Sequence, residues 1–149
     1  MSDPRELYQQ VILEHNKKPR NFGKLEPCTH HAEGHNPLCG DQLEVSLVVE
    51  NGLLADIRFQ GSGCAIDVAS ASLMTGHVKG KTVAEAEAMA EQFRGMVRGE
   101  LEPGTGTPLL GRLTLFSGVK DLPSRVKCAV LPWATLHAAL KGEAEASTE

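Results

Sequence analysis

The chain has 149 residues, of which 41% are hydrophobic and 23% charged, and its formal net charge is -4. This length fits a single domain that buries a core, and the acidic balance argues against nucleic acid as a partner. No apolar run approaches the roughly 20 residues that span a bilayer, and residues 1–4 lack the layout of a secretory signal. We therefore expect a cytoplasmic protein with no membrane partner, whose four cysteines are free thiols or metal ligands rather than disulfides.

The N-terminal part predicts a helix that starts at Pro4 and ends before Pro19. Its apolar face consists of Leu7, Tyr8, Val11, Ile12 and His15. The basic residues at its end are interpreted as solvated, and they are Lys17, Lys18, Arg20 and Lys24. Residues 28–35, with Cys28 and three histidines, predict a short edge strand or a loop. The histidines could bind adventitious metal, and a solvated loop is the favoured interpretation of them.

Alternation of apolar and polar residues predicts an antiparallel β-hairpin over residues 42–59 with one buried face. A two-residue turn at Asn51-Gly52 would place apolar residues of one strand opposite polar residues of the other. A three-residue turn that also includes Glu50 is therefore expected, and it would set Val45 opposite Ile57.

The remaining elements are predicted, in chain order, as a helix over 65–78, a helix over 83–98, a surface loop over 100–111, a short helix over 112–120 and a helix over 123–141. A capping box at Thr82 opens the second of these helices, and Pro132 kinks or restarts the last. We expect one domain over residues 1–141 and a disordered acidic tail over 142–149.

The segment Asn36 to Asp41 (NPLCGD) is the centre of the predicted site. In an extended chain, Cys39 and Asp41 point to the same side. Extending the hairpin register sets Cys39 opposite Gly63, beside Cys64. Cys64 precedes a helix whose N-terminus favours a thiolate, although a small cysteine packed behind that helix is the alternative.

Four groups could form one metal site, and they are Cys39, Asp41, Cys64 and Cys128. Three thiolates and a carboxylate suit tetrahedral zinc or iron in an iron–sulfur cluster. The lack of any CxxC pair argues against a zinc finger or ribbon. From these residues alone, ordinary buried thiols remain the alternative.

Four segments carry a resemblance to a known family, and they are Tyr8–Gly23 (YQQVILEHNKKPRNFG), Asn36–Asp41 (NPLCGD), Gly61–Ser72 (GSGCAIDVASAS) and Arg125–Cys128 (RVKC) followed by Trp133. With these segments the chain resembles the U-type iron–sulfur cluster assembly proteins, the IscU/SufU family that includes the N-terminal part of NifU. The resemblance implies an α+β, SufE/NifU-like fold, in which helices cover a small antiparallel sheet of about three strands. It also implies that the three cysteines and the aspartate gather at one exposed end.

The resemblance further implies a role in iron–sulfur cluster biogenesis beside a pyridoxal-phosphate (PLP) dependent cysteine desulfurase of the SufS/IscS type. Downstream assembly proteins or recipient apoproteins would be the other partners. In the SufU-like branch the four positions hold Zn²⁺ and a cysteine accepts and carries persulfide sulfur, so that the protein is a zinc-dependent sulfurtransferase partner. In the scaffold branch the same positions hold iron in a transient [2Fe–2S] cluster, and a structural zinc adaptor is a third interpretation.

Two features favour the SufU-like branch. Lys127 precedes Cys128 where scaffold members usually have a histidine, and residues 99–121 resemble the extra segment of SufU-like proteins. Cys39 is the expected sulfur acceptor because Gly40 would let it swing out, and Cys128 is the alternative acceptor. The carboxylate of the set would act as a labile oxygen ligand that keeps the metal exchangeable.

Overall fold

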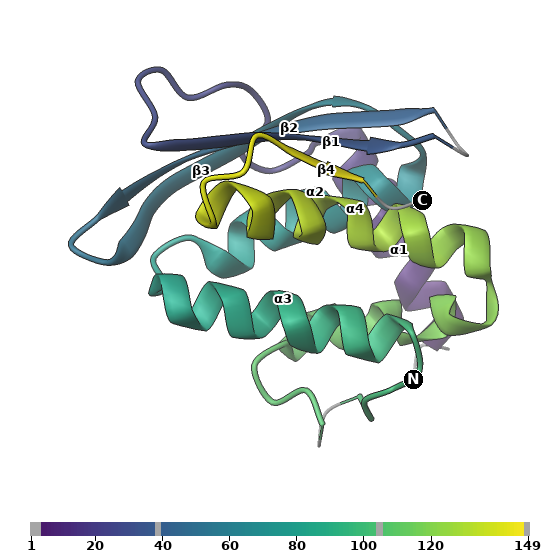
Figure 1. The fold of residues 1–149 in the computed structure, drawn as a ribbon. Helices are drawn as coiled ribbons and strands as arrows, with labels where there is room; N and C mark the ends of the chain where they lie inside the picture. Colours follow the sequence, from purple (N-terminus) through teal and green to yellow (C-terminus); the bar gives the residue numbers. More distant parts are fainter. Residues whose placement is uncertain (1–3, 38–39, 104–105, 148–149) are drawn as a thin grey trace.

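The structure is a computed structural model that describes residues 4–37, 40–103 and 106–147. Its elements are α1 (Pro4–Lys17), β1 (His30–Asn36), β2 (Asp41–Glu50), β3 (Leu53–Ser62), α2 (Ala65–Val78), α3 (Val83–Val97), the 3₁₀ helix η1 (Gly111–Asp121), α4 (Pro123–Leu140) and β4 (Glu145–Ser147). The sheet forms one layer, α2 and α4 pack against one of its faces, and α3 lies on the far side of α4 (Figure 1). This arrangement confirms the predicted α+β fold.

The β2–β3 hairpin has a shorter turn than the one predicted. Glu50 pairs directly with Leu53, so the turn contains two residues, Asn51 and Gly52. Both have positive φ angles, of 55° and 78°, as a type I′ turn requires. The predicted three-residue turn is therefore wrong.

A β-bulge keeps the apolar side chains of both strands on the same face of the sheet, although a two-residue turn alone would have placed them on opposite faces. Ala55 has no partner in β2, because the pairing skips one residue of β3 at this point. Beyond the bulge Val45 lies opposite Phe59 rather than Ile57, and the apolar side chains of both strands still point to the core. The predicted partner of Cys39 rested on the wrong register, and Cys39 itself lies outside the described residues.

The sheet has four described strands in the order β3-β2-β1-β4, and it is mixed rather than purely antiparallel. β1 pairs with β2 on one side and, in parallel, with β4 on the other, so residues 30–36 are neither an edge strand nor a loop. β4 comes from the stretch for which disorder was predicted. Its middle residue, Ala146, packs against the core, and the N–H of Glu33 donates to the carbonyl of Ala144, just before β4, at 2.8 Å. Pairing with the otherwise open edge of β1 thus orders the residues of β4, although their composition alone suggests a solvated tail.

The helices follow their sequence signals closely. Thr82 and Glu85 form the predicted capping box at the start of α3, with N···O distances of 3.0 Å and 3.3 Å. Pro132 lies inside α4, which continues to Leu140, so the helix does not restart there. None of the helices in the described part of the chain is long and apolar enough to cross a membrane.

The core lies between the sheet and the outer helices. Trp133 of α4 stacks on Phe93 of α3 with ring centroids 4.9 Å apart, and Phe93 meets Phe116 of η1 edge to face at 5.6 Å. The predicted short helix over 112–120 is therefore part of the core rather than of a surface excursion.

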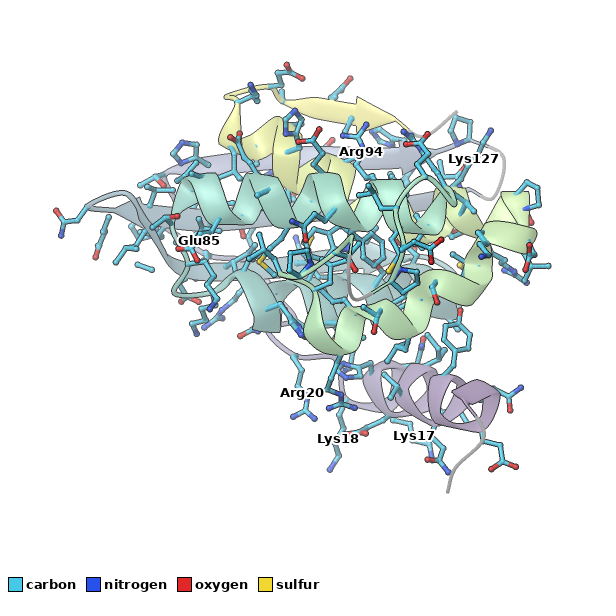
Figure 2. All side chains as sticks on the ribbon, turned by 90° about the horizontal axis from the view of Figure 1, so that it is seen from below. Lys17, Lys18, Arg20, Glu85, Arg94 and Lys127 are labelled. Carbon is cyan, nitrogen blue, oxygen red and sulfur yellow. The ribbon has the colours of Figure 1, made fainter. Side chains whose placement is uncertain are left out.

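The N-terminal helix is fixed to α2 through the predicted buried face. His15 Nδ1 lies 2.6 Å from the hydroxyl of Ser72, and both side chains are buried. At the end of this helix Lys17, Lys18 and Arg20 lie at the surface (Figure 2), as the interpretation of this basic run predicted. Two members of the run also form ion pairs, Arg20 with Glu14 at 3.1 Å and Lys24 with Glu26 at 3.3 Å.

Candidate metal centre

Asp41 is the first residue of β2, and its side chain is only 4% exposed. Its Oδ1 accepts a hydrogen bond from the backbone N–H of Cys64, with an N···O distance of 3.2 Å. This bond ties the start of the strand to the start of α2. Its Oδ2 is buried and has no hydrogen-bond partner among the described residues. A buried carboxylate oxygen is costly in this state unless a cation lies close to it.

Cys64 is the N-cap residue of α2, with φ -69° and ψ 167°. Its sulfur accepts a hydrogen bond from the backbone N–H of Asp67 at 3.5 Å. The N–H groups at this end of the helix therefore place partial positive charge beside the sulfur. Cys64 is half-buried and caps the helix, so it does not simply pack behind it.

Cys128 reaches the same point from α4, and its side chain is fully buried. The side-chain amide of Asn36 donates a hydrogen bond to its sulfur at an N···S distance of 3.8 Å. Asn36 is the last residue of β1 and pairs with Asp41, the first residue of β2. Asn36 therefore connects the Cys128 sulfur on α4 to the strand that carries Asp41.

The fold brings Asp41, Cys64 and Cys128 together although they lie far apart in the chain. One carboxylate oxygen and two sulfurs lie within 4.8 Å of one another. This spacing suits ligands around one ion, and two thiols with a carboxylate are a donor set that zinc and iron both accept. Cys39, the fourth predicted ligand, lies outside the described residues, and Gly40 beside it has a φ of +72°.

A second buried carboxyl group, Asp67, lies beside the site in the first turn of α2. Burial, and then the neighbouring carboxylate of Asp41, raise the pKa of Asp67 to about 8. Its Oδ1 has no hydrogen-bond partner among the described residues. The approach of the two groups depends on Gly63, because a Cβ there would collide with Asp67 Oδ2 and stand 3.2 Å from Asp41 Cγ. With its raised pKa, Asp67 keeps a proton near neutral pH, and a hydrogen bond between the Asp67 and Asp41 side chains adds to the shift. The buried Asp41 Oδ2 beside two thiols is the oxygen that fits a bound cation.

Sequence reasoning did not assign Asn36 or Asp67 to the site. Asn36 is the first residue of the NPLCGD segment, but its contact with Cys128 depends on where α4 lies. Asp67 follows Cys64 by three residues, which is the spacing at which an N-cap and the first turn of a helix meet. That spacing is the signal that could have identified it.

The other candidate groups lie elsewhere. Cys28 is half-buried in the segment before β1, and no histidine of the described chain joins the cluster of Asp41, Cys64 and Cys128. His77, for example, lies 2.8 Å from the carbonyl of Leu73 within α2.

Comparison with known proteins places the chain in a family. The model of the NifU-like N-terminal domain matches residues 7–143, which is most of the chain. The chain belongs to the NifU-like N-terminal domain family. The segments that carry the sequence resemblance all lie within the matched range.

The relatives of this NifU-like chain are named either as scaffold proteins or as a sulfurtransferase. It is 37% identical over 146 residues to the iron–sulfur cluster assembly scaffold protein IscU of Streptococcus pyogenes serotype M1, covering 98% of this chain and 90% of that protein. It is 37% identical over 131 residues to the zinc-dependent sulfurtransferase SufU of Bacillus subtilis strain 168, covering 88% and 87%. The crystal structure of a candidate iron–sulfur cluster assembly scaffold for the SUF system from Fervidobacterium islandicum AW-1 is similar, with a TM-score of 0.83 and 34% identity over 91% of this chain and 98% of that one.

Proposed function

We propose that this protein serves iron–sulfur cluster assembly as a zinc-dependent acceptor and carrier of persulfide sulfur. The observation that carries the proposal is the cluster of Asp41, Cys64 and Cys128, whose ligand atoms lie within 4.8 Å of one another. The similarity to a zinc-dependent sulfurtransferase over most of both chains supports the same activity. The partner that supplies sulfur would be a PLP-dependent cysteine desulfurase.

The proposed ligands are Cys39, Asp41, Cys64 and Cys128. Bound zinc would keep the sulfurs as thiolates near neutral pH, and it has no redox chemistry with which to reduce an arriving sulfane sulfur. The N-terminus of α2 places N–H groups beside the Cys64 sulfur, and the amide of Asn36 donates a hydrogen bond to the Cys128 sulfur. Asp41 supplies an oxygen ligand that exchanges more readily than a thiolate does.

The proposed transfer step exchanges one sulfur–sulfur bond for another. The Cys39 thiolate attacks the outer sulfur of the persulfide on the desulfurase cysteine. A bond forms between these two sulfurs, the sulfur–sulfur bond of the desulfurase persulfide breaks, and its cysteine leaves as a thiolate. No net oxidation or reduction occurs, because one sulfane sulfur has moved between two thiols.

The burial of the thiols bears on which cysteine reacts first. Cys128 is fully buried and accepts a hydrogen bond from Asn36, so a partner's persulfide has no direct path to its sulfur. This burial favours Cys39 as the first acceptor over Cys128, the alternative acceptor.

A scaffold for a [2Fe–2S] cluster is the second candidate function. The relatives named IscU favour it, and one of them, from Thermotoga maritima, is 40% identical over 136 residues. The same thiols and carboxylate would then hold iron and sulfide that are later passed to a recipient protein. Lys127 in place of the usual histidine, and the extra segment over 99–121, favour sulfur transfer instead.

Sulfane-sulfur transfer distinguishes the candidates. Zinc-loaded protein is incubated with a cysteine desulfurase and cysteine, and persulfide is mapped by mass spectrometry. We expect persulfide on Cys39, faster turnover of cysteine, loss of both in Cys39→Ser, and retention of both in the matched control Cys28→Ser. A protein that gains no persulfide, but turns brown with charge-transfer absorption after anaerobic addition of iron and sulfide, would instead be a scaffold. Neither response would leave a structural adaptor.

A further inference from the structure

The solvent face of β1 carries a row of metal-ligating side chains. Alternation along the strand points His31, Glu33 and His35 outward, while Ala32 and Gly34 are buried. The neighbouring strands add carboxylates at the same level, since Glu33 pairs with Glu44 of β2 and with Glu145 of β4. Three carboxylates are therefore directly opposed across three strands, an arrangement that repulsion destabilises.

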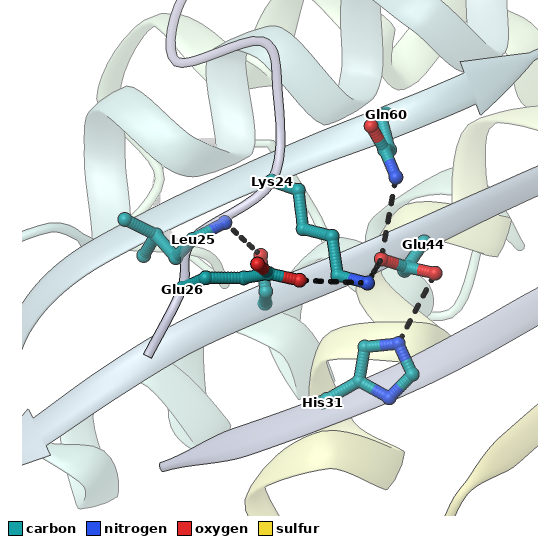
Figure 3. Close-up of polar contacts among 7 residues, drawn as sticks. Lys24, Leu25, Glu26, His31, Glu44 and Gln60 are labelled. Carbon is teal, nitrogen blue, oxygen red and sulfur yellow. Dashed lines mark hydrogen bonds and ion pairs between the residues drawn. The ribbon is translucent and has the colours of Figure 1, made fainter. Parts of the chain in front are cut away.

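The carboxylate on the β2 side is already compensated (Figure 3). Glu44 lies 3.2 Å from His31 Nε2 and 4.0 Å from Lys24 Nζ, and it accepts a hydrogen bond from the side-chain amide of Gln60 at 3.3 Å. These partners neutralise and orient Glu44 without an ion.

The carboxylates on the β4 side have no such partners. The side chains of Glu33, His35 and Glu145 place one ligand atom each within 4.8 Å of one another. None of the three side chains has a hydrogen bond or ion pair with any group in the described part of the chain. Two glutamates face each other across a parallel ladder, and no lysine or arginine of the described residues forms an ion pair with either of them.

We propose that Glu33, His35 and Glu145 bind a divalent cation of the zinc type on the outer face of the sheet. Two carboxylate oxygens and one imidazole nitrogen suit zinc and similar transition metals, whereas calcium and magnesium take oxygen ligands. An open hollow of about 440 Å³ adjoins Glu33 and His35 and extends from them over Gln42 toward β3, which leaves room for water beside these two side chains.

The ion would fasten β4 to the sheet. β4 has three residues and pairs with the rest of the protein only through β1 in the described structure. Glu145 is its first residue, so an ion shared with Glu33 and His35 links the C-terminal strand to β1 side chain to side chain. This site lies on the face of the sheet opposite to the helices and uses none of the proposed sulfur-transfer ligands.

Zinc stoichiometry and the exchange of the C-terminal amides test the inference together. Purified protein is equilibrated with excess zinc, gel-filtered and assayed for bound zinc per chain, and hydrogen exchange is followed at residues 145–147. We expect wild type to bind one equivalent more than Glu33→Gln or His35→Asn, and zinc to slow exchange in β4 by at least about tenfold in wild type but not in these two variants. His31→Asn is the matched control on the same face, and it should keep the wild-type stoichiometry and protection.

Equal stoichiometry in wild type and Glu33→Gln would overturn the inference. Loss of the equivalent in His31→Asn but not in His35→Asn would overturn it too, because the ion would then lie on the β2 side. A protein whose only zinc depends on Glu33 and His35 would uphold this site while contradicting the thiolate centre.

Discussion

Replacing Asp67 by Asn should change how the stability of the metal-free protein depends on pH. The folded Asp67 has a pKa of about 8, against 3.8 for an unperturbed aspartate. Between these values the folded side chain keeps a proton that the unfolded chain has released. The unfolded state binds fewer protons there, so the free energy of unfolding falls as pH rises through this window. An asparagine at this position does not titrate.

The size of the effect follows from the shift. From about pH 5 to about pH 7 each pH unit removes about 1.4 kcal/mol, so the contribution of Asp67 falls by about 2.7 kcal/mol. Urea unfolding of reduced, chelator-treated protein at several pH values in this range measures the effect. Wild type should lose about 2.7 kcal/mol more than Asp67→Asn over the two units.

The matched control is Glu50→Gln, an exposed carboxylate at the opposite end of β2 from Asp41. It should keep the pH dependence of wild type. Wild type and Asp67→Asn with the same change in unfolding free energy over this range would refute the reasoning, because burial beside Asp41 could not then be raising the pKa of Asp67.

The remaining predictions concern packing and the sulfur environment. Gly34→Ala should destabilise the fold by about 1–3 kcal/mol in urea unfolding, because its Cβ would collide with the Thr135 hydroxyl. Gly76→Ala is its control, since the added methyl meets open space within a helix; it should stabilise by up to about 1 kcal/mol, and equal effects at both sites would contradict the packing argument. Asn36→Ala should lower zinc affinity about 10–100-fold in chelator competition, since Cys128 loses its amide donor, and an unchanged affinity would show that this donor does not support the ligand.

Local sequence signals were sufficient for the helices and insufficient for the sheet. The capping box at Thr82 and the proline at the start of α4 place helix starts, because both act within one turn of the chain. The hairpin was misassigned because two arrangements both put the apolar residues of the two strands on one face of the sheet. One is a three-residue turn, and the other is a two-residue turn with an extra residue in one strand. Alternation could not reveal Ala55 as that residue. β4 was missed because its ordering depends on the open edge of β1, which composition does not describe.

The same contrast between local signals and long-range contacts applies to the candidate metal centre. The NPLCGD segment and the cysteine at the start of α2 could be identified as candidates from residue type and position. The roles of Asn36 and Asp67 could not, because each depends on a contact between elements far apart in the sequence. The register that seemed to bring two thiols together was off by two residues. What the structure brings together instead is the carboxylate of Asp41 with the N–H of Cys64.

Three of the proposed ligands, Asp41, Cys64 and Cys128, come from the start of a strand, the tip of one helix and the interior of another. An ion held by all of them acts as a crosslink that exists only in the folded state, and occupancy at 1,000 times the dissociation constant would add about 4 kcal/mol of stability. A molecule that has lost its ion would therefore unfold more readily than a loaded one. A partner that contacts several of these elements at once could distinguish the metal-bound protein from the metal-free protein.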